Sequence, residues 1–91
     1  MERKEVEKVV KETIFEKMGE FNGLDHAAQI MNEDELDMDM AMDPFDLLEV
    51  LIGIEEKMDI RVPDDVFGDK SVDELTVGIF VDMLYDWLES K

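Results

Sequence analysis

The chain lacks cysteine altogether, has one histidine, and has only nine basic residues against 26 acidic ones. Without cysteine it can form neither disulfides nor a thiolate-bound zinc site, so packing must hold its core together. The formal net charge of −17 disfavours nucleic acid and anionic lipid as direct partners, because like charges repel. The charge balance therefore favours a basic protein as the partner.

Long apolar runs are also missing. No segment approaches the roughly 20 apolar residues that cross a bilayer, and the charged start of the chain does not resemble a signal peptide. Apolar residues still make up 45% of the 91 residues, which favours a folded domain over disorder. We expect one monomeric domain over residues 1–91, located in the cytoplasm and not bound to membranes.

Few residues offer catalytic chemistry. Nucleophilic catalysis needs a serine or cysteine near a histidine and an orienting acid, whereas the serines, Ser71 and Ser90, lie in or near the last apolar segment. The lone histidine, His26, lies in a polar stretch and is best interpreted as a solvated surface residue. We therefore expect a protein that is not an enzyme.

The acidic segment 37–43 is the best candidate for a metal site. Asp37 and Asp39 would be the first and third residues of a calcium-binding loop, but Met42 stands where that loop needs glycine, and Leu48 where it needs glutamate. Clustered carboxylates without this geometry bind divalent ions only weakly. We expect no specific metal and no cofactor.

Helical periodicity begins near the start of the chain. Over residues 6–21 the apolar residues recur at three- and four-residue spacing, at Val6, Val9, Val10, Ile14, Met18 and Phe21, which predicts one amphipathic helix. Gly19, Asn22 and Gly23 are stop signals, and Gly23 suits the left-handed conformation that closes a helix.

Residues 22–42 form a connection long enough to have a function or to be partly packed. Residues 26–31 suit a short helical turn, and the later alternation resembles a strand, but no second strand-like segment exists to pair with it. We expect an ordered loop that buries Leu36 and some of its methionines. The alternative for Met31, Met38, Met40 and Met42 is an adaptable apolar contact patch.

A central helix is predicted at Pro44–Met58. Asp43 can accept hydrogen bonds from free amides, Pro44 suits the first helical position, and Asp46 complements the helix dipole. Its apolar stripe is expected at Phe45, Leu48, Leu51, Ile52 and residues 55–58, beside an acidic flank at Asp46, Glu49, Glu55 and Glu56. Ile60, Val62 and Pro63 are expected to end it.

The remaining residues predict a short turn and a last helix. Residues 63–67 suit a helical turn that places Val66 and Phe67 on the core. The last helix starts either at the Ser71 to Glu74 capping box or at Thr76. Its apolar stripe is Leu75, Ile79, Phe80, Met83, Leu84, Trp87 and Leu88. The pattern as a whole predicts an all-α bundle of three to four helices.

Residues 42–65 resemble the central helix and exit loop of acyl carrier proteins. The family has an Asp-Ser-Leu step where this chain has Asp43-Pro44-Phe45, then acidic positions along the helix, and an Asp-Ile, apolar residue, Pro-Asp exit matched by residues 59–64. Thr76-Val77-Gly78 is similar to the start of the family's last helix. The resemblance covers about residues 36–88.

The resemblance implies a right-handed four-helix bundle with a short third helix. Members of the family carry acyl groups as thioesters on a phosphopantetheine arm, and acidic residues of their second helix dock on basic patches of acyl-assembly enzymes. The residues that match such docking positions are Asp43, Asp46, Glu49, Glu55 and Glu56.

The sequence departs from the family at the attachment site. The arm is joined to the serine that follows the aspartate, and Pro44 stands there with no hydroxyl. The approach to the helix also lacks the family's usual glycine and reads Met40-Ala41-Met42. We expect a carrier-like binding module without the arm. The alternatives are a functional carrier in which Pro44 is a variant residue, and an acidic decoy for a basic nucleic-acid-binding protein.

Overall fold

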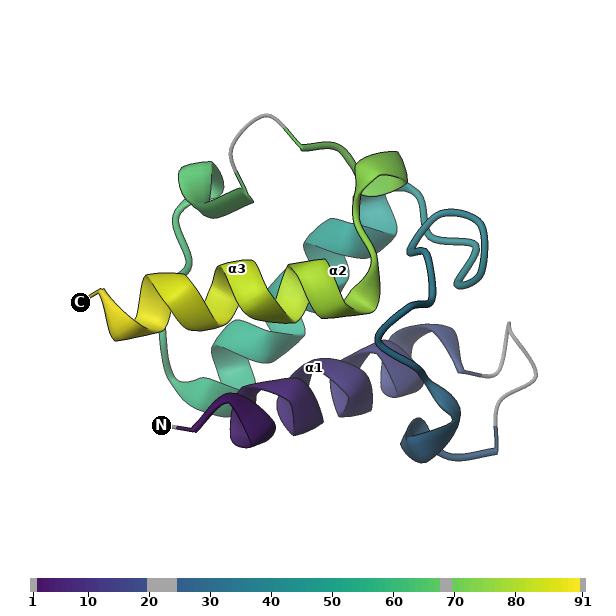
Figure 1. Cartoon of the computed structure of the whole chain (residues 1–91), viewed down its shortest axis with the longest axis horizontal. Coiled ribbons are helices and arrows are strands. Elements are labelled where there is room, and N and C mark those ends of the chain that lie inside the picture. The colour runs from purple at the N-terminus through teal and green to yellow at the C-terminus, as the bar shows by residue number, and fades with distance from the viewer. Residues whose placement is uncertain (1, 20–24, 68–69, 91) are drawn as a thin grey trace.

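Three α-helices and three 3-10 turns follow one another along the chain in a computed structural model that describes residues 2–19, 25–67 and 70–90. They are α1 Arg3–Met18, η1 Ala27–Gln29, α2 Pro44–Met58, η2 Asp64–Phe67, η3 Val72–Glu74 and α3 Val77–Glu89 (Figure 1). The described residues contain no sheet, and one isolated antiparallel bridge joins Glu35 to Thr76. The fold is a compact all-α domain.

Helix α1 begins at Arg3, three residues before the predicted start, and its last residue is Met18. The early start was missed because the first turn is charged and adds nothing to the apolar pattern. One face of the helix is buried, namely Val6, Val10, Thr13, Ile14 and Met18. The predicted end at Phe21 and the left-handed closure at Gly23 lie outside the described residues. Gly19 follows the helix in a right-handed conformation.

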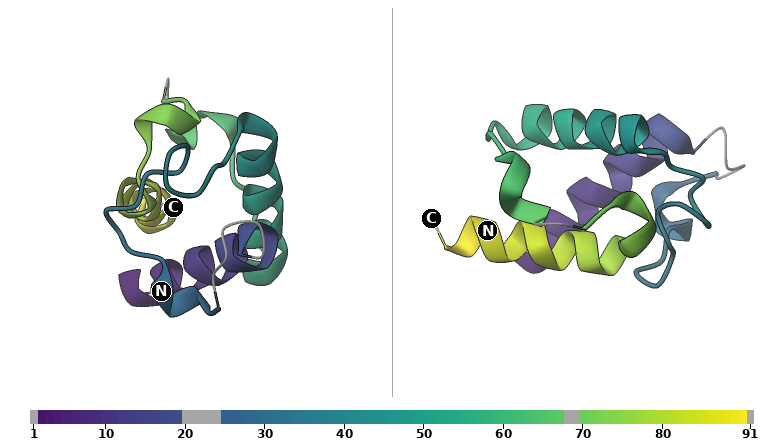
Figure 2. Two further views of the ribbon diagram at one scale, coloured as in Figure 1. Left: turned by 90° about the vertical axis from the view of Figure 1, so that its right-hand side faces the viewer. Right: turned by 90° about the horizontal axis from the view of Figure 1, so that it is seen from above.

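Helix α1 packs against both other helices, and the two views in Figure 2 show it crossing α2 while lying beside α3. Two ion pairs join these elements. The Arg3 guanidinium lies 2.6 Å from the carboxylate of Asp82 on α3, and the Lys57 ammonium on α2 lies 2.8 Å from the carboxylate of Glu16. Because all four side chains are partly exposed, each pair adds only a small free energy, about 0–1 kcal/mol.

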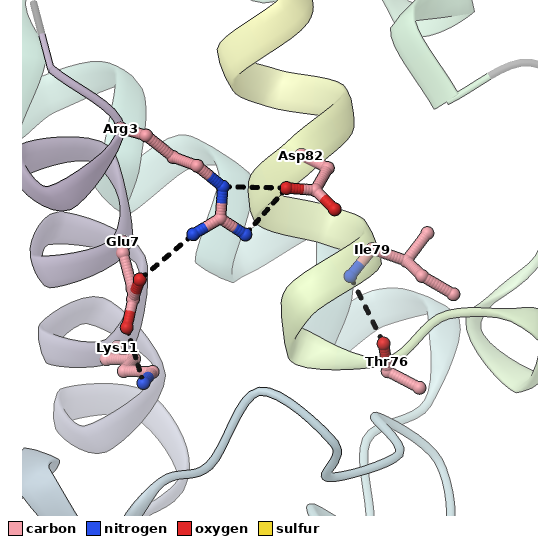
Figure 3. Close-up of polar contacts among 6 residues, drawn as sticks. All are labelled: Arg3, Glu7, Lys11, Thr76, Ile79 and Asp82. Carbon is pink, nitrogen blue, oxygen red and sulfur yellow. Dashed lines mark hydrogen bonds and ion pairs between the residues drawn. The ribbon is translucent and has the colours of Figure 1, made fainter.

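A row of charges on α1 continues from Arg3 (Figure 3). The Glu7 carboxylate lies 2.9 Å from the Lys11 ammonium and 3.1 Å from the Arg3 guanidinium. The hydrogen bond from Lys11, together with the positive charges of both neighbours, holds the pKa of Glu7 below its ordinary value. Glu7 is therefore stabilised in its charged form.

The long connection is ordered where it is described, and it is fixed against the start of α3. The N–H of Leu36 donates to the Leu75 carbonyl at 3.0 Å, and the N–H of Val77 donates to the Asp34 carbonyl at 2.9 Å. Leu36, Met40 and Met42 are buried, as expected of an inward-facing loop, whereas Met31 and Met38 are exposed. The alternating segment thus pairs with the start of α3 through a single bridge, Glu35 to Thr76, which is too short to form a strand.

Between α2 and α3, the described residues 59–67 and 70–76 form 3-10 turns and no α-helix. The segment expected to form the short third helix is η2, four residues long, and it places Phe67 on the core as predicted. The Phe67 ring stacks on Phe80 of α3, with ring centres 4.7 Å apart. Of the two predicted starts for the last helix, Thr76 caps α3, since its hydroxyl accepts from the Ile79 N–H at 3.1 Å (Figure 3). Ser71 precedes η3 instead.

Candidate functional site

The start of α2 is closed by two aspartates that cap each other. The Asp43 carboxylate accepts from the Asp46 N–H at 2.8 Å, and the Asp46 carboxylate accepts from the Asp43 N–H at 3.2 Å. Pro44 lies between them as the first helical residue and is exposed. The predicted cap and boundaries are confirmed. The reciprocal bond of Asp46 was missed, although an acid three residues after the cap is its sequence signal.

The backbone approaching α2 is strained at one residue. Ala41 has a φ of 53°, a left-handed conformation that costs alanine about 1–2 kcal/mol and that glycine adopts freely. Its neighbours Met40 and Met42 are both buried. The left-handed residue lets the chain bury a methionine on each side of Ala41 before it turns into the helix.

The exposed face of α2 is apolar and contains three residues of the predicted core-facing stripe, whereas Leu51 and Met58 of that stripe pack against the core as predicted. Phe45 is 78% exposed, Leu48 53% and Ile52 46%. The fully buried residues of α2 are instead Val50 and Ile54. They are supported by the partly buried Leu47, Leu51 and Met58.

The prediction failed because α2 is apolar on more than one face. Such a helix has two possible core-facing stripes, and periodicity alone cannot choose between them. We attribute the choice to α1, which packs against α2 with the Thr13 side chain close to Gly53. This contact turns Val50 and Ile54 inward and leaves the stripe of Phe45, Leu48 and Ile52 facing outward.

The five acids matched to docking positions have two different roles. Asp43 and Asp46 bond to each other's backbone, and the Glu55 carboxylate accepts from the Val62 N–H at 2.7 Å. Glu49 and Glu56 are exposed, and within the described part of the chain their carboxylates form no hydrogen bond or ion pair. Only these two are therefore presented to a partner without first losing an internal bond.

The end of α2 creates a hollow beside the exposed stripe. Asp59 adopts a left-handed conformation with φ 53°, and the next N–H, that of Ile60, donates back to the Glu55 carbonyl at 3.1 Å. The helix thus ends at Met58 as predicted, and Asp59 closes it, because aspartate tolerates this conformation better than most residues. The turned-back chain and α2 enclose a hollow of about 430 Å³. Its apolar lining is Leu48, Leu51, Ile52, Ile60 and Val62.

Neither a membrane span nor a metal cluster is found in residues 2–19, 25–67 and 70–90. No helix there is long and apolar enough to cross a bilayer. No group of three or more histidine, aspartate or glutamate side chains there is arranged to hold a metal ion.

Comparisons with family models, curated proteins and solved structures found no match. The class that the fold and site define is therefore a compact all-α domain that presents an apolar and acidic helix face.

Proposed function

We propose that this protein is an acyl-carrier-like binding module, with the four-helix topology of that family, that docks on enzymes of fatty-acid, polyketide or related acyl assembly without a phosphopantetheine arm. The observation that carries the proposal is Pro44, the exposed first residue of α2, in the place of the arm-bearing serine. Because proline has no hydroxyl, the phosphodiester that joins the arm to a carrier cannot form there.

The backbone before α2 supports the same proposal. Ala41 holds a left-handed conformation, which glycine adopts most easily, in the segment where the resemblance expects a glycine. The chain thus has a conformation suited to the family's glycine while having alanine in its place. The backbone at the start of α2 thus has the conformation expected of a carrier, although the hydroxyl that would bear the arm is absent.

The charge of the outer face supports docking on a basic enzyme surface. Glu49 and Glu56 are exposed on α2, and the formal net charge of −17 steers the module toward positive patches. Asp43, Asp46 and Glu55 contribute to the same negative field, while their hydrogen bonds hold the two ends of the helix.

Mass spectrometry tests the absence of the arm. After incubation with coenzyme A and a broad-specificity phosphopantetheinyl transferase, the intact mass of the protein is expected to stay unchanged, and a gain equal to the arm would overturn the proposal. The variant Pro44→Ser restores a hydroxyl at the same exposed position. Its modification would support a carrier-like surface, whereas an unmodified, folded variant would count against the resemblance.

Binding to acyl-assembly enzymes tests the docking role. Isothermal titration is expected to show binding that is lost in the double variant Glu49→Lys/Glu56→Lys and kept in Glu5→Lys, which reverses an exposed charge on α1. Equal losses in both proteins would mean that net charge alone, and not α2, recognises the enzyme.

A further inference from the structure

We infer that a second hollow, between η2 and the end of α3, binds a primary alkylammonium group, which is the chemistry of a free aliphatic amine or of a lysine side chain. Asp86 supplies the negative charge of this site, and Trp87 and Met83 supply its apolar surface. The site shares no residue with α2, so the inference does not depend on the proposed function.

The hollow combines an apolar wall with a few polar groups. Its volume is about 420 Å³, within the range of sites that hold small molecules. It is lined by Val66 of η2, by Met83, Asp86 and Trp87 of α3, and by Ser90. The turn η2 packs against α3, and Figure 1 shows both near the C-terminus of the chain. The ligand of such a site has an apolar body and one polar head.

The end of α3 is negative. A helix C-terminus has free carbonyl groups with a partial negative charge, which basic residues in the last turn ordinarily offset. The last turns of α1 and α2 contain Lys17 and Lys57, whereas the last turn of α3 contains no basic residue. It contains Asp86 and Glu89 instead. A cation bound beside this turn therefore meets a negative charge that no lysine or arginine of the same turn offsets.

Two polar groups of the hollow are able to receive an ammonium. Asp86 is exposed, and within the described part of the chain its carboxylate forms no hydrogen bond or ion pair. The Ser90 hydroxyl donates to the Trp87 carbonyl at 2.8 Å, which leaves its oxygen able to accept. The negative charge of Glu89, together with that of Asp86, raises the pKa of the neighbouring Tyr85 phenol above its ordinary value. The negative field thus extends around the last turns of the helix.

An alkylammonium suits this hollow better than a metal ion or an anion does. A divalent metal ion needs several oxygen ligands, and the hollow offers a single carboxylate. An anion is repelled by the formal net charge of −17. A primary ammonium has three N–H donors for acidic and hydroxyl oxygens. Its carbon chain packs on apolar side chains while the charge is attracted to an indole ring such as that of Trp87.

The test uses Trp87, the one tryptophan of the chain, as a fluorescent reporter in the full-length protein. The protein is titrated with n-butylammonium, n-hexylammonium and neutral n-hexanol at constant ionic strength and neutral pH. We expect a saturable change with n-hexylammonium and about fourfold weaker binding of n-butylammonium, which buries two fewer methylenes. Binding of n-hexanol, which lacks the charge, is expected to be at least about tenfold weaker. Amide NMR shifts at Val66, Asp86 and Ser90 locate the ligand independently.

A variant removes the charge of the hollow and keeps its shape. Asp86→Asn is expected to weaken n-hexylammonium binding by about 5- to 10-fold and to leave n-hexanol binding unchanged. The matched control is Glu33→Gln, which removes an exposed charge from the connection before α2 and is expected to change the affinity by less than about twofold. Far-UV circular dichroism and melting temperatures confirm that both variants are folded.

A blocked lysine, acetylated at its α-amino group and amidated at its carboxyl group, distinguishes the two sources of the ligand. It has the same four-carbon stem as n-butylammonium. Equal affinity for both would assign the hollow to lysine side chains of proteins, and at least about tenfold weaker binding of the blocked lysine would assign it to free amines. Either result supports the site.

Three outcomes overturn the inference. They are equal binding of n-hexanol and n-hexylammonium, full binding by Asp86→Asn, and the absence of a saturable change in both fluorescence and the amide shifts of the hollow. None of these results involves position 44 or the acids of α2, so a failure here is distinct from a failure of the proposed function.

Discussion

Thr13 of α1 and Gly53 of α2 touch where the two helices cross: a Cβ added to Gly53 would lie 2.8 Å from the Thr13 Cγ2 atom. Thr13 is fully buried, and its hydroxyl donates to the Val9 carbonyl at 2.7 Å. The methyl group therefore has little freedom to move away. Glycine at position 53 lets the helices approach closely, and this approach decides which side of α2 is exposed.

The first prediction concerns Gly53→Ala. In an open helix this change stabilises by about 0.5–1 kcal/mol, but here overpacking against Thr13 costs about 1–3 kcal/mol. We expect a net loss of about 1 kcal/mol in the free energy of unfolding, measured by urea denaturation followed by circular dichroism. A more stable Gly53→Ala protein would contradict the close crossing.

The matched control is Thr13→Ser, which removes the methyl group and keeps the hydroxyl. In the double variant Thr13→Ser/Gly53→Ala the two losses should be less than additive, because the serine leaves room for the new Cβ. Strict additivity would mean that the two positions do not interact.

A second prediction concerns Ala41, which has a positive φ. Ala41→Gly relieves backbone strain but increases the entropy of the unfolded chain, so we expect a net gain of about 0.5 kcal/mol. Ala41→Val should instead lose more than about 1 kcal/mol, since a β-branched residue is worse in this conformation. Chemical denaturation measures both. Ala28→Gly, at an exposed residue of η1 without a positive φ, should not gain stability.

The caps at Thr76 and Ser71 support a third prediction. Thr76→Ala removes the hydroxyl that accepts from the Ile79 N–H and should cost about 1 kcal/mol. Ser71 precedes only a three-residue turn, so Ser71→Ala should cost less. Thermal melts of the two variants compare them directly, and an equal or larger loss for Ser71→Ala would place the start of the last helix at the earlier cap.

The fourth prediction is a pH dependence at Glu7. Its ion pairs lower its pKa in the folded protein, so its stabilising contribution is complete above the ordinary glutamate pKa of about 4.3. The contribution is lost as the pH falls through the lowered folded-state value. The difference in unfolding free energy between wild type and Glu7→Gln should thus be positive at neutral pH and approach zero in acid.

A control for this titration is Glu5→Gln. It removes the same charge from α1, and within the described residues Glu5 forms no ion pair, so it corrects for the effect of net charge on stability. If Glu5→Gln and Glu7→Gln gave the same pH profile, the ion pairs of Glu7 with Lys11 and Arg3 would make no specific contribution.

The candidate site was predictable only in part. The boundaries of α2 follow from Asp43 and Pro44, because capping and the fixed φ of proline act within a few residues. The sequence did not predict which face of α2 is exposed. Phe45 and Val50 are both apolar, and only contact with α1 decides which of them is buried. The same limit applies to the docking acids, because the bond from the Val62 N–H to Glu55 depends on how the chain turns back after α2, which the local helix signals do not specify.

The sequence by itself determined the all-α class, the start of α2 and the absence of a hydroxyl at Pro44, because helix signals are local and side-chain chemistry is independent of folding. Tertiary structure alone decided which apolar stripe of α2 is exposed and which loop methionines are buried. Both depend on how closely two elements approach, as Thr13 and Gly53 show. Such a distance is set by residues far apart in the chain, and the apolar spacing within either segment does not indicate it.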